Sequence, residues 1–270
     1  MLYRWKIRSL KRPRLNLLWR RWRARQGESV GNYSFLPDYI RKYAPGRSFA
    51  DIGCMWGVNG EYAFMAEEAG ATRVVAVDVF GPTPEFDEKH RTRYSRVQFV
   101  LGDVTRRQTL EAIGHAEVVF CAGVLYHHPS PYDLLVALRQ ICTRTLILRT
   151  STLPEVRGLP NAAVFFPMLR ERQRELWNLR SLGVLHQAGI SNEFEPAAGY
   201  SNWFWGLTPS CLESLLQLAG FRVEHRATEA FAQTCVCEAV TDPLEHQLPD
   251  AASARRLGEE ISTANVARPA

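Results

Sequence analysis

The chain has 270 residues, a formal net charge of +5 and a hydrophobic content of 46%. This length can bury a sizeable core, and one α/β domain with extensions accounts for it. No uncharged run is long enough to span a bilayer, and the first residues lack the continuous apolar core of a signal peptide. We therefore expect neither a transmembrane helix nor a secretory leader.

The positive charge is concentrated at the N-terminus. Residues 1–26 hold ten of the 33 basic residues and no acid, which leaves 23 basic against 28 acidic residues in the remainder. Trp and Leu side chains alternate with these charges, and Pro13 divides the segment, so residues 1–30 are predicted to form a basic amphipathic arm. Three interpretations stay open: a solvated or packed arm, attachment to an anionic membrane surface, or RNA contact. The predicted location is cytoplasmic, membrane-associated on the cytoplasmic face if the arm binds lipid.

The first motif is SFADIGCMWGVNG at residues 48–60. It predicts a buried strand, a tight turn at Gly53 and Gly57, and a helix over residues 59–69 that ends at Gly70. This pattern is typical of the βα unit of a parallel sheet, in which a ligand lies against the turn.

A second strand, Arg73 to Val77, leads to Asp78 about twenty residues beyond the turn, where a carboxylate can accept both hydroxyls of a ribose. Asp51 adds a carboxylate suited to an ammonium group. Met55 occupies the middle position at which a dinucleotide fingerprint has glycine, which argues against a phosphate cradle and an oxidoreductase. A nucleoside without phosphate, S-adenosylmethionine, fits this turn better.

Three further strands are predicted, and they alternate with helical segments in the order of a doubly wound sheet. The third, residues 97–105, ends in Asp103, placed to accept from an adenine amino group while the Val104 backbone N–H meets a ring nitrogen. The fourth begins residues 116–131, which continue as a loop over the methionine end, and the fifth is residues 145–152.

These segments resemble class I S-adenosylmethionine-dependent methyltransferases, closely over residues 32–152 and more loosely over 200–240. The resemblance implies an α/β fold with a doubly wound, Rossmann-like, mostly parallel seven-stranded sheet, spanning residues 31–240. It implies S-adenosyl-L-methionine as the cofactor. The cofactor-binding residues that it implies are Asp51, Gly53, Cys54, Gly57, Asp78, Asp103, Val104, Gly123 and Tyr126.

Within that superfamily, GVLYHHPSPYDLL and NWFWGLTPSCLESLLQLAGF resemble the bacterial tRNA wobble-uridine carboxymethyltransferases. The resemblance matches Tyr126 to a tyrosine that helps to hold a carboxylated donor, but the accompanying cations have no match here. Ordinary S-adenosylmethionine is therefore the expected donor. The acidic body also disfavours a nucleic-acid substrate, because phosphate binding needs a cationic surface.

An aromatic-rich insertion follows the fifth strand, at residues 153–205, and is predicted to form a lid over the substrate. Most of its rings are expected to pack as a small core, whereas Trp203 and Trp205 are predicted as walls of the substrate pocket. Arg149, toward the end of the fifth strand, either holds an acidic acceptor or forms a surface ion pair. The aromatic residues are Phe165, Phe166, Trp177, Tyr200, Trp203, Phe204 and Trp205.

His127 and His128 follow the fourth strand and are the candidate catalytic bases, with orientation of the cofactor cover as their other interpretation. The predicted activity is O-methylation of a small-molecule, glycan or lipid-linked acceptor. The alternatives are modification of a tRNA wobble uridine and a module that binds S-adenosylmethionine without catalysis.

The six cysteines are not spaced like the ligands of a metal site, so no metal site is predicted. Cys235 and Cys237 are expected to pack on one face of a strand, and residues 241–270 are predicted to form a polar tail.

Overall fold

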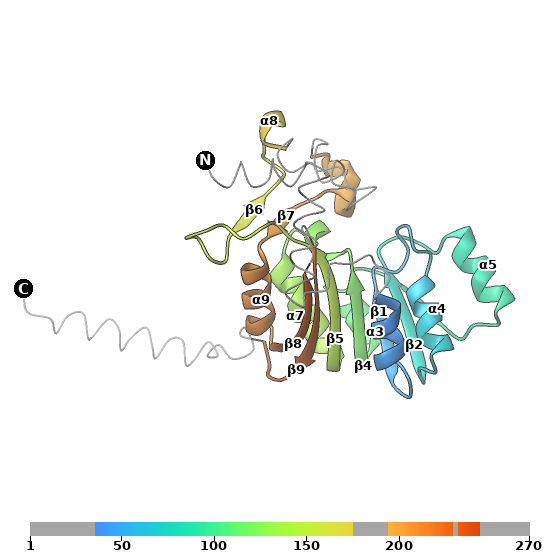
Figure 1. The fold of residues 1–270 in the computed structure, drawn as a ribbon. Helices are drawn as coiled ribbons and strands as arrows, with labels where there is room; N and C mark the ends of the chain where they lie inside the picture. Colours follow the sequence, from blue (N-terminus) through green and yellow to red (C-terminus); the bar gives the residue numbers. More distant parts are fainter. Residues whose placement is uncertain (1–35, 175–193, 229–231, 244–270) are drawn as a thin grey trace, which may run out of the picture.

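The computed structural model of the protein describes residues 36–174, 194–228 and 232–243. A seven-stranded sheet forms the centre of the molecule (Figure 1). Its strand order is β3-β2-β1-β4-β5-β9-β8, with β1 to β5 parallel and β9 antiparallel to both of its neighbours. The strands in chain order are β1 (Ser48–Ile52), β2 (Arg73–Asp78), β3 (Gln98–Leu101), β4 (Ala116–Ala122), β5 (Cys142–Ser151), β8 (Phe221–Thr228) and β9 (Ala232–Ala239).

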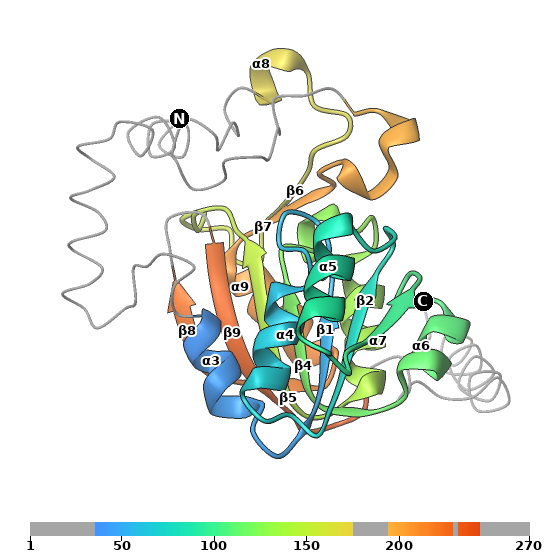
Figure 2. The same ribbon diagram turned by 90° about the vertical axis from the view of Figure 1, so that its right-hand side faces the viewer.

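Helices cover both faces of the sheet (Figures 1 and 2). One apolar core lies between the sheet and α3, α4 and α5, and a second core lies between the other face and α6, α7 and α9. The helices are α3 (Leu36–Tyr43), α4 (Glu61–Glu68), α5 (Pro84–Thr92), α6 (Arg107–Ile113), α7 (Pro131–Ile141) and α9 (Pro209–Leu218).

The central strands are apolar on both faces, as a sheet covered by two helical layers requires. Four of the five residues of β1 and five of the six of β2 are buried. Along β1, Phe49 belongs to the core under α4 and Ala50 to the core under α7. The predicted doubly wound, mostly parallel seven-stranded sheet is therefore confirmed.

Two strand boundaries differ from the prediction. The third strand stops at Leu101. The Gly102 N–H still donates to the Asp78 carbonyl, but the chain then turns, so Asp103 lies beyond the strand. The fifth strand begins earlier than expected, at Cys142. Cys235 and Cys237 are buried in the same core, as expected of packing residues.

The insertion after β5 forms a second layer above the carboxyl ends of the parallel strands (Figure 2). Its described parts include an antiparallel pair, β6 (Ala163–Phe165) with β7 (Trp205–Leu207), the short helix α8 (Glu171–Arg174) and the 3-10 helix η5 (Pro196–Ser201). A bridge between Thr152 and Leu207 joins this pair to the end of β5. The predicted arm at residues 1–30, Trp177 and nearly all of the predicted tail lie outside the described residues.

The turn after β1 carries an ordinary backbone at Met55, whereas Gly53, Gly57 and Gly60 have positive φ angles. The Met55 side chain is buried among the residues under α4. Glycine is therefore required on either side of this position but not at it, and the methionine fills the core instead of the space above the turn.

No helix among the described residues is both long and apolar enough to cross a bilayer.

Replacement of Gly53 by alanine tests the close approach of two loops. Gly53 has a φ of 81°, and a Cβ atom there would lie 2.2 Å from Cγ2 of Val124. At Gly70 the φ is 91° and no atom lies within 4 Å of an added Cβ. Gly70→Ala should lower the free energy of unfolding by about 1–2 kcal/mol through backbone strain alone. Gly53→Ala should lower it by at least about 1 kcal/mol more than Gly70→Ala does, because the added Cβ also clashes with Val124. Equal losses in urea unfolding would contradict this packing.

Candidate functional site

Asp51 is a buried acid near the carboxyl end of β1. Its side chain is 1% exposed, and the backbone N–H of Ala63, the third residue of α4, donates to the carboxylate. The helix N-terminus favours negative charge at that place. Within the described part of the chain, Oδ2 of Asp51 is buried and has no hydrogen-bond partner. Burial raises the pKa of Asp51 to about 8, and the nearby Asp78 carboxylate acts in the same direction.

Asp78 lies at the end of the adjacent strand β2. Its Oδ2 accepts the backbone N–H of Met55 at 2.7 Å, and its Oδ1 accepts the N–H of Phe80 at 2.9 Å. Burial raises the pKa of Asp78, although these N–H donors act in the opposite direction. The N–H of Val79 is a third donor to this carboxylate, which has about four lone-pair sites and can still accept at least one hydroxyl group.

Asp103 follows β3 and accepts hydrogen bonds from two residues, while Arg106 forms an ion pair with it at 3.7 Å. Its Oδ1 accepts from the N–H and the hydroxyl of Thr105, and its Oδ2 accepts from the hydroxyl of Tyr200 at 2.6 Å. Burial acts to raise the pKa of Asp103, but the hydrogen bonds from Tyr200 and Thr105 outweigh it and the pKa is lowered. Tyr200 belongs to η5, so the insertion reaches the third acid of the site.

The same part of the insertion contacts the loop after β4. Nδ1 of His127 lies 2.8 Å from the carbonyl oxygen of Asn202, and the N–H of Phe204 donates to the Tyr126 carbonyl at 2.9 Å. The Asn202 side chain fixes the turn, because it bonds to the backbone of Glu195 and Gly199. Residues 195–204 thus form a strap from the β3 loop to the β4 loop.

The two candidate bases differ in their surroundings. The hydrogen bond from His127 to a carbonyl places the proton on Nδ1 and leaves the lone pair on Nε2. Burial lowers the pKa of His127 to about 4, so its ring is neutral at pH 7. His128 directs its Nδ1 toward the backbone of Ser130 and stacks on Tyr200, with ring centroids 5.5 Å apart.

Trp203 and Trp205, both predicted as pocket walls, have different hydrogen bonding. Trp205 is half-buried, lies against Phe165 with the two rings tilted by 52°, and donates its indole N–H to the Pro129 carbonyl at 2.8 Å. Trp203 is 7% exposed, with its ring centroid 4.2 Å from that of Tyr126. Its Nε1 is buried and has no partner among the described residues.

Arg149 is not on the surface, which corrects one of its two predicted roles. It is 3% exposed at the end of β5, where its guanidinium donates to the Thr234 hydroxyl at 3.1 Å. Its carbonyl also accepts the N–H of Gly123, so Arg149 supports the loop after β4.

The remaining predicted cofactor residues lie along the same carboxyl edge. Gly53 and Cys54 direct their N–H groups to the Val77 carbonyl, and Gly57 is exposed in the turn. The Val104 side chain is buried in the core under α7. Gly123 has a φ of 81° and lies beside Tyr126, whose ring is buried. The described residues contain no cluster of acids, histidines and cysteines that could hold a metal ion.

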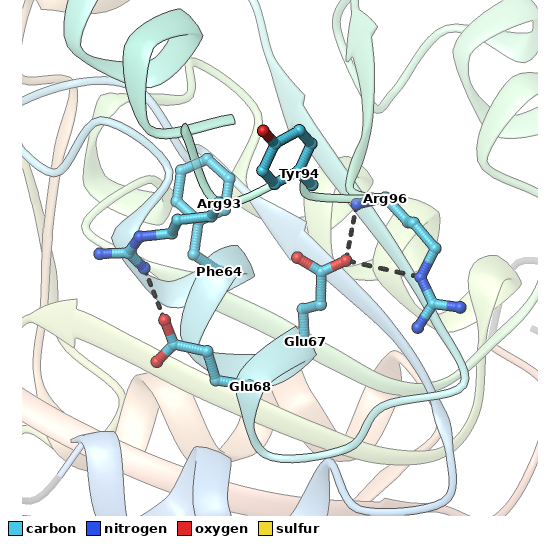
Figure 3. A pocket seen from close by; sticks show the side chains of 6 residues that line it. All are labelled: Phe64, Glu67, Glu68, Arg93, Tyr94 and Arg96. Atoms are coloured by element: carbon cyan, nitrogen blue, oxygen red, sulfur yellow. Dashed lines mark hydrogen bonds and ion pairs between the residues drawn. The ribbon is translucent and has the colours of Figure 1, made fainter. Parts of the chain in front are cut away.

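A separate hollow of about 550 Å³ is lined by residues of α4 and of the segment that follows α5 (Figure 3). Its polar walls are engaged with each other, since Arg93 pairs with Glu68 and Arg96 with Glu67. None of the predicted site residues lines it, so it is not the candidate site.

Sequence reasoning did not single out Tyr200 or Asn202. Tyr200 lies 97 residues from its partner Asp103, and Asn202 lies 75 residues from His127. The only sequence signal was the high aromatic content of the insertion. This content does not predict which aromatic side chain contacts the end of which strand.

No protein-family model and no curated protein sequence matches this chain. Solved structures with a similar fold include 1,6-didemethyltoxoflavin-N1-methyltransferase of Burkholderia thailandensis, determined with its substrate and S-adenosylhomocysteine. Its TM-score is 0.51 at 16% identity, over 76% of each chain. The N-terminal domain of EvdMO1 with bound S-adenosylhomocysteine has a TM-score of 0.52 at 16% identity, over 78% of this chain and 85% of that one. This chain therefore shares its fold with these proteins.

The raised pKa of Asp51 gives a testable dependence of stability on pH. The folded protein holds a proton on Asp51 up to about pH 8, whereas the unfolded chain releases it near pH 4. Stability from this group is therefore present below about pH 4 and is lost as the pH rises through about 8. Between these limits, the free energy of unfolding without ligand should fall with pH more steeply in the wild type than in Asp51→Asn, by up to about 1.4 kcal/mol per pH unit. Equal slopes in urea unfolding would show that Asp51 is ionised.

Proposed function

We propose that this chain is an S-adenosylmethionine-dependent methyltransferase that transfers a methyl group to an oxygen of a small-molecule acceptor. The observation that carries the proposal is the series Asp51, Asp78 and Asp103 at the carboxyl ends of three adjacent parallel strands, beside the Gly53 turn. The fold is that of proteins determined with the demethylated product, S-adenosylhomocysteine, which supports the proposal.

The residues present fit this cofactor. The unpartnered Oδ2 of Asp51 and the remaining acceptor capacity of Asp78 lie where a cationic amino acid head and a ribose would be held. Asp51 is protonated at pH 7 in the free protein, and the described residues show no ion pair of a basic side chain with Asp51 or Asp78, so a positively charged ligand would favour the ionised form of Asp51. Met55 takes no space above the turn, because its side chain is in the core.

Asp103 has the third role, as the acceptor for the adenine amino group. The bound cofactor would supply a methyl group on a cationic sulfur, which an acceptor lone pair takes while the carbon–sulfur electron pair returns to sulfur. The protein must therefore align the acceptor and accept its proton. Of the two histidines, His127 is the better base, because the Asn202 carbonyl fixes its tautomer and Nε2 has its lone pair available.

A small-molecule acceptor is supported by the buried, aromatic surroundings of the loop after β4. Tyr126, His127 and Trp203 pack against one another there. The toxoflavin enzyme of the same fold was determined with bound 1,6-didemethyltoxoflavin, which agrees with a small-molecule acceptor.

Calorimetry with S-adenosylhomocysteine tests the proposal directly. The wild type should bind it, and Asp78→Asn should bind it about tenfold to a hundredfold more weakly, because charged acceptors of hydroxyl groups are lost. Asp87→Asn on the exposed side of α5 is the matched control and should bind like the wild type. Absence of binding to the wild type would refute the cofactor assignment. Binding without label transfer from methyl-labelled donor to any small-molecule extract would favour the non-catalytic module.

The hydroxyl of Tyr200 donates to Oδ2 of Asp103, the carboxylate that would accept the adenine amino group. Tyr200→Phe removes this competing donor from Asp103, and we expect about threefold to tenfold tighter binding of S-adenosylhomocysteine. The control is Tyr94→Phe, since Tyr94 is 91% exposed beside the hollow of Figure 3 and should not alter binding. Weaker binding to Tyr200→Phe would mean that the hydroxyl belongs to the cofactor pocket.

A further inference from the structure

The indole N–H of Trp203 is the starting observation. In the described part of the chain, only two buried side-chain nitrogen or oxygen atoms lack a hydrogen-bond partner, Nε1 of Trp203 and Oδ2 of Asp51. A buried N–H without an acceptor is costly and rare in folded proteins, so an acceptor atom of a ligand is its natural partner. The N–H of Trp205, two residues along, already has a carbonyl partner and carries no such signal.

Three other rings surround Trp203. Tyr126 lies 4.2 Å away between ring centroids, His127 lies 5.8 Å away at an interplanar angle of 76°, and Phe166 lies 6.2 Å away. Aromatic faces of this kind favour a flat ring, by offset or edge-to-face contact. The indole N–H would add a single polar contact to otherwise apolar walls.

His127 contributes the complementary group. Its Nδ1–H is engaged by the Asn202 carbonyl, so Nε2 is the nitrogen that can take a proton. Burial lowers the pKa of His127 to about 4, and such a weak base takes a proton readily only from an acidic hydroxyl. A phenol or enol fulfils this condition much better than an aliphatic alcohol.

Resting on the methyltransferase function proposed above, we propose that the acceptor is a planar aromatic compound with a phenolic hydroxyl, whose oxygen accepts the Trp203 indole N–H. The hydroxyl donates its proton to Nε2 of His127, and the oxygen lone pair thereby released forms the bond to the transferred methyl carbon. Trp203 is then a residue that determines specificity, through one hydrogen bond that a saturated or oxygen-free compound cannot use in the same way.

Binding of three matched probes to the full chain saturated with S-adenosylhomocysteine tests this proposal. The probes are 2-naphthol, naphthalene, which lacks the oxygen, and 2-decalol, which lacks the flat ring and the acidity. Binding is followed by calorimetry and, for the two aromatic probes, by their own fluorescence. We expect 2-naphthol to bind at least about tenfold more tightly than either of the others.

Trp203→Phe keeps an aromatic ring in the wall while it removes the N–H together with one of the two fused rings. It should weaken 2-naphthol about tenfold and leave naphthalene within about twofold, while Tyr94→Phe should change neither. An equal loss for both aromatic probes would make Trp203 a wall alone and overturn the proposal. Unchanged 2-naphthol binding, preference for 2-decalol, or no binding by any probe would overturn it too. Failure of the wild type to bind S-adenosylhomocysteine at the outset would instead refute the proposed function itself.

Discussion

The burial of two neighbouring carboxylates with no basic side chain described beside them is the constraint around which this structure is arranged. Asp51 and Asp78 lie on adjacent strands, both almost inaccessible to solvent. Desolvation raises the pKa of each, and Asp51 is left with an unpartnered oxygen. Such an arrangement works against the stability of the free protein. A bound cation would offset this cost, as the cofactor proposed above would do.

The strap at residues 195–204 closes this edge of the sheet from above. It is joined to the β3 loop by Tyr200 and to the β4 loop by His127 and Tyr126. One short segment therefore contacts the proposed adenine site and the proposed acceptor site together. The Asn202 side chain holds the turn between the two ends by hydrogen bonds to the backbone of Glu195 and Gly199. A displacement of one end of the strap should therefore displace the other end.

Much of the fold could be predicted from the sequence because its signals are local. Apolar runs such as RVVAVD and the glycines at positions of positive φ fix strands and turns without distant partners. The three acids could be named as candidates for the same reason, as each lies at or just beyond the carboxyl end of a strand. The end of β3 was misplaced because a polar residue after Gly102 gives no sign of whether pairing continues.

Long-range contacts were beyond the reach of the sequence. The bond between Tyr200 and Asp103 depends on how an insertion folds back over the sheet, and a string of aromatic residues does not encode that path. The burial of Arg149 depends on β9 joining β5 in the antiparallel sense, which brings Thr234 beside it. The unpartnered indole of Trp203 likewise becomes visible only once all of its neighbours are in place.

Met55 has a consequence for how such chains are found. Its backbone amide reaches the acid on β2 in an everyday conformation, and its thioether side chain fills space beneath the first helix after the turn. Signature patterns that insist on glycine there would overlook a chain whose backbone makes the turn without it. A search that requires glycine only at positions with a left-handed backbone conformation would retain such a chain. It would also group diverged sequences that patterns of residue identity fail to relate.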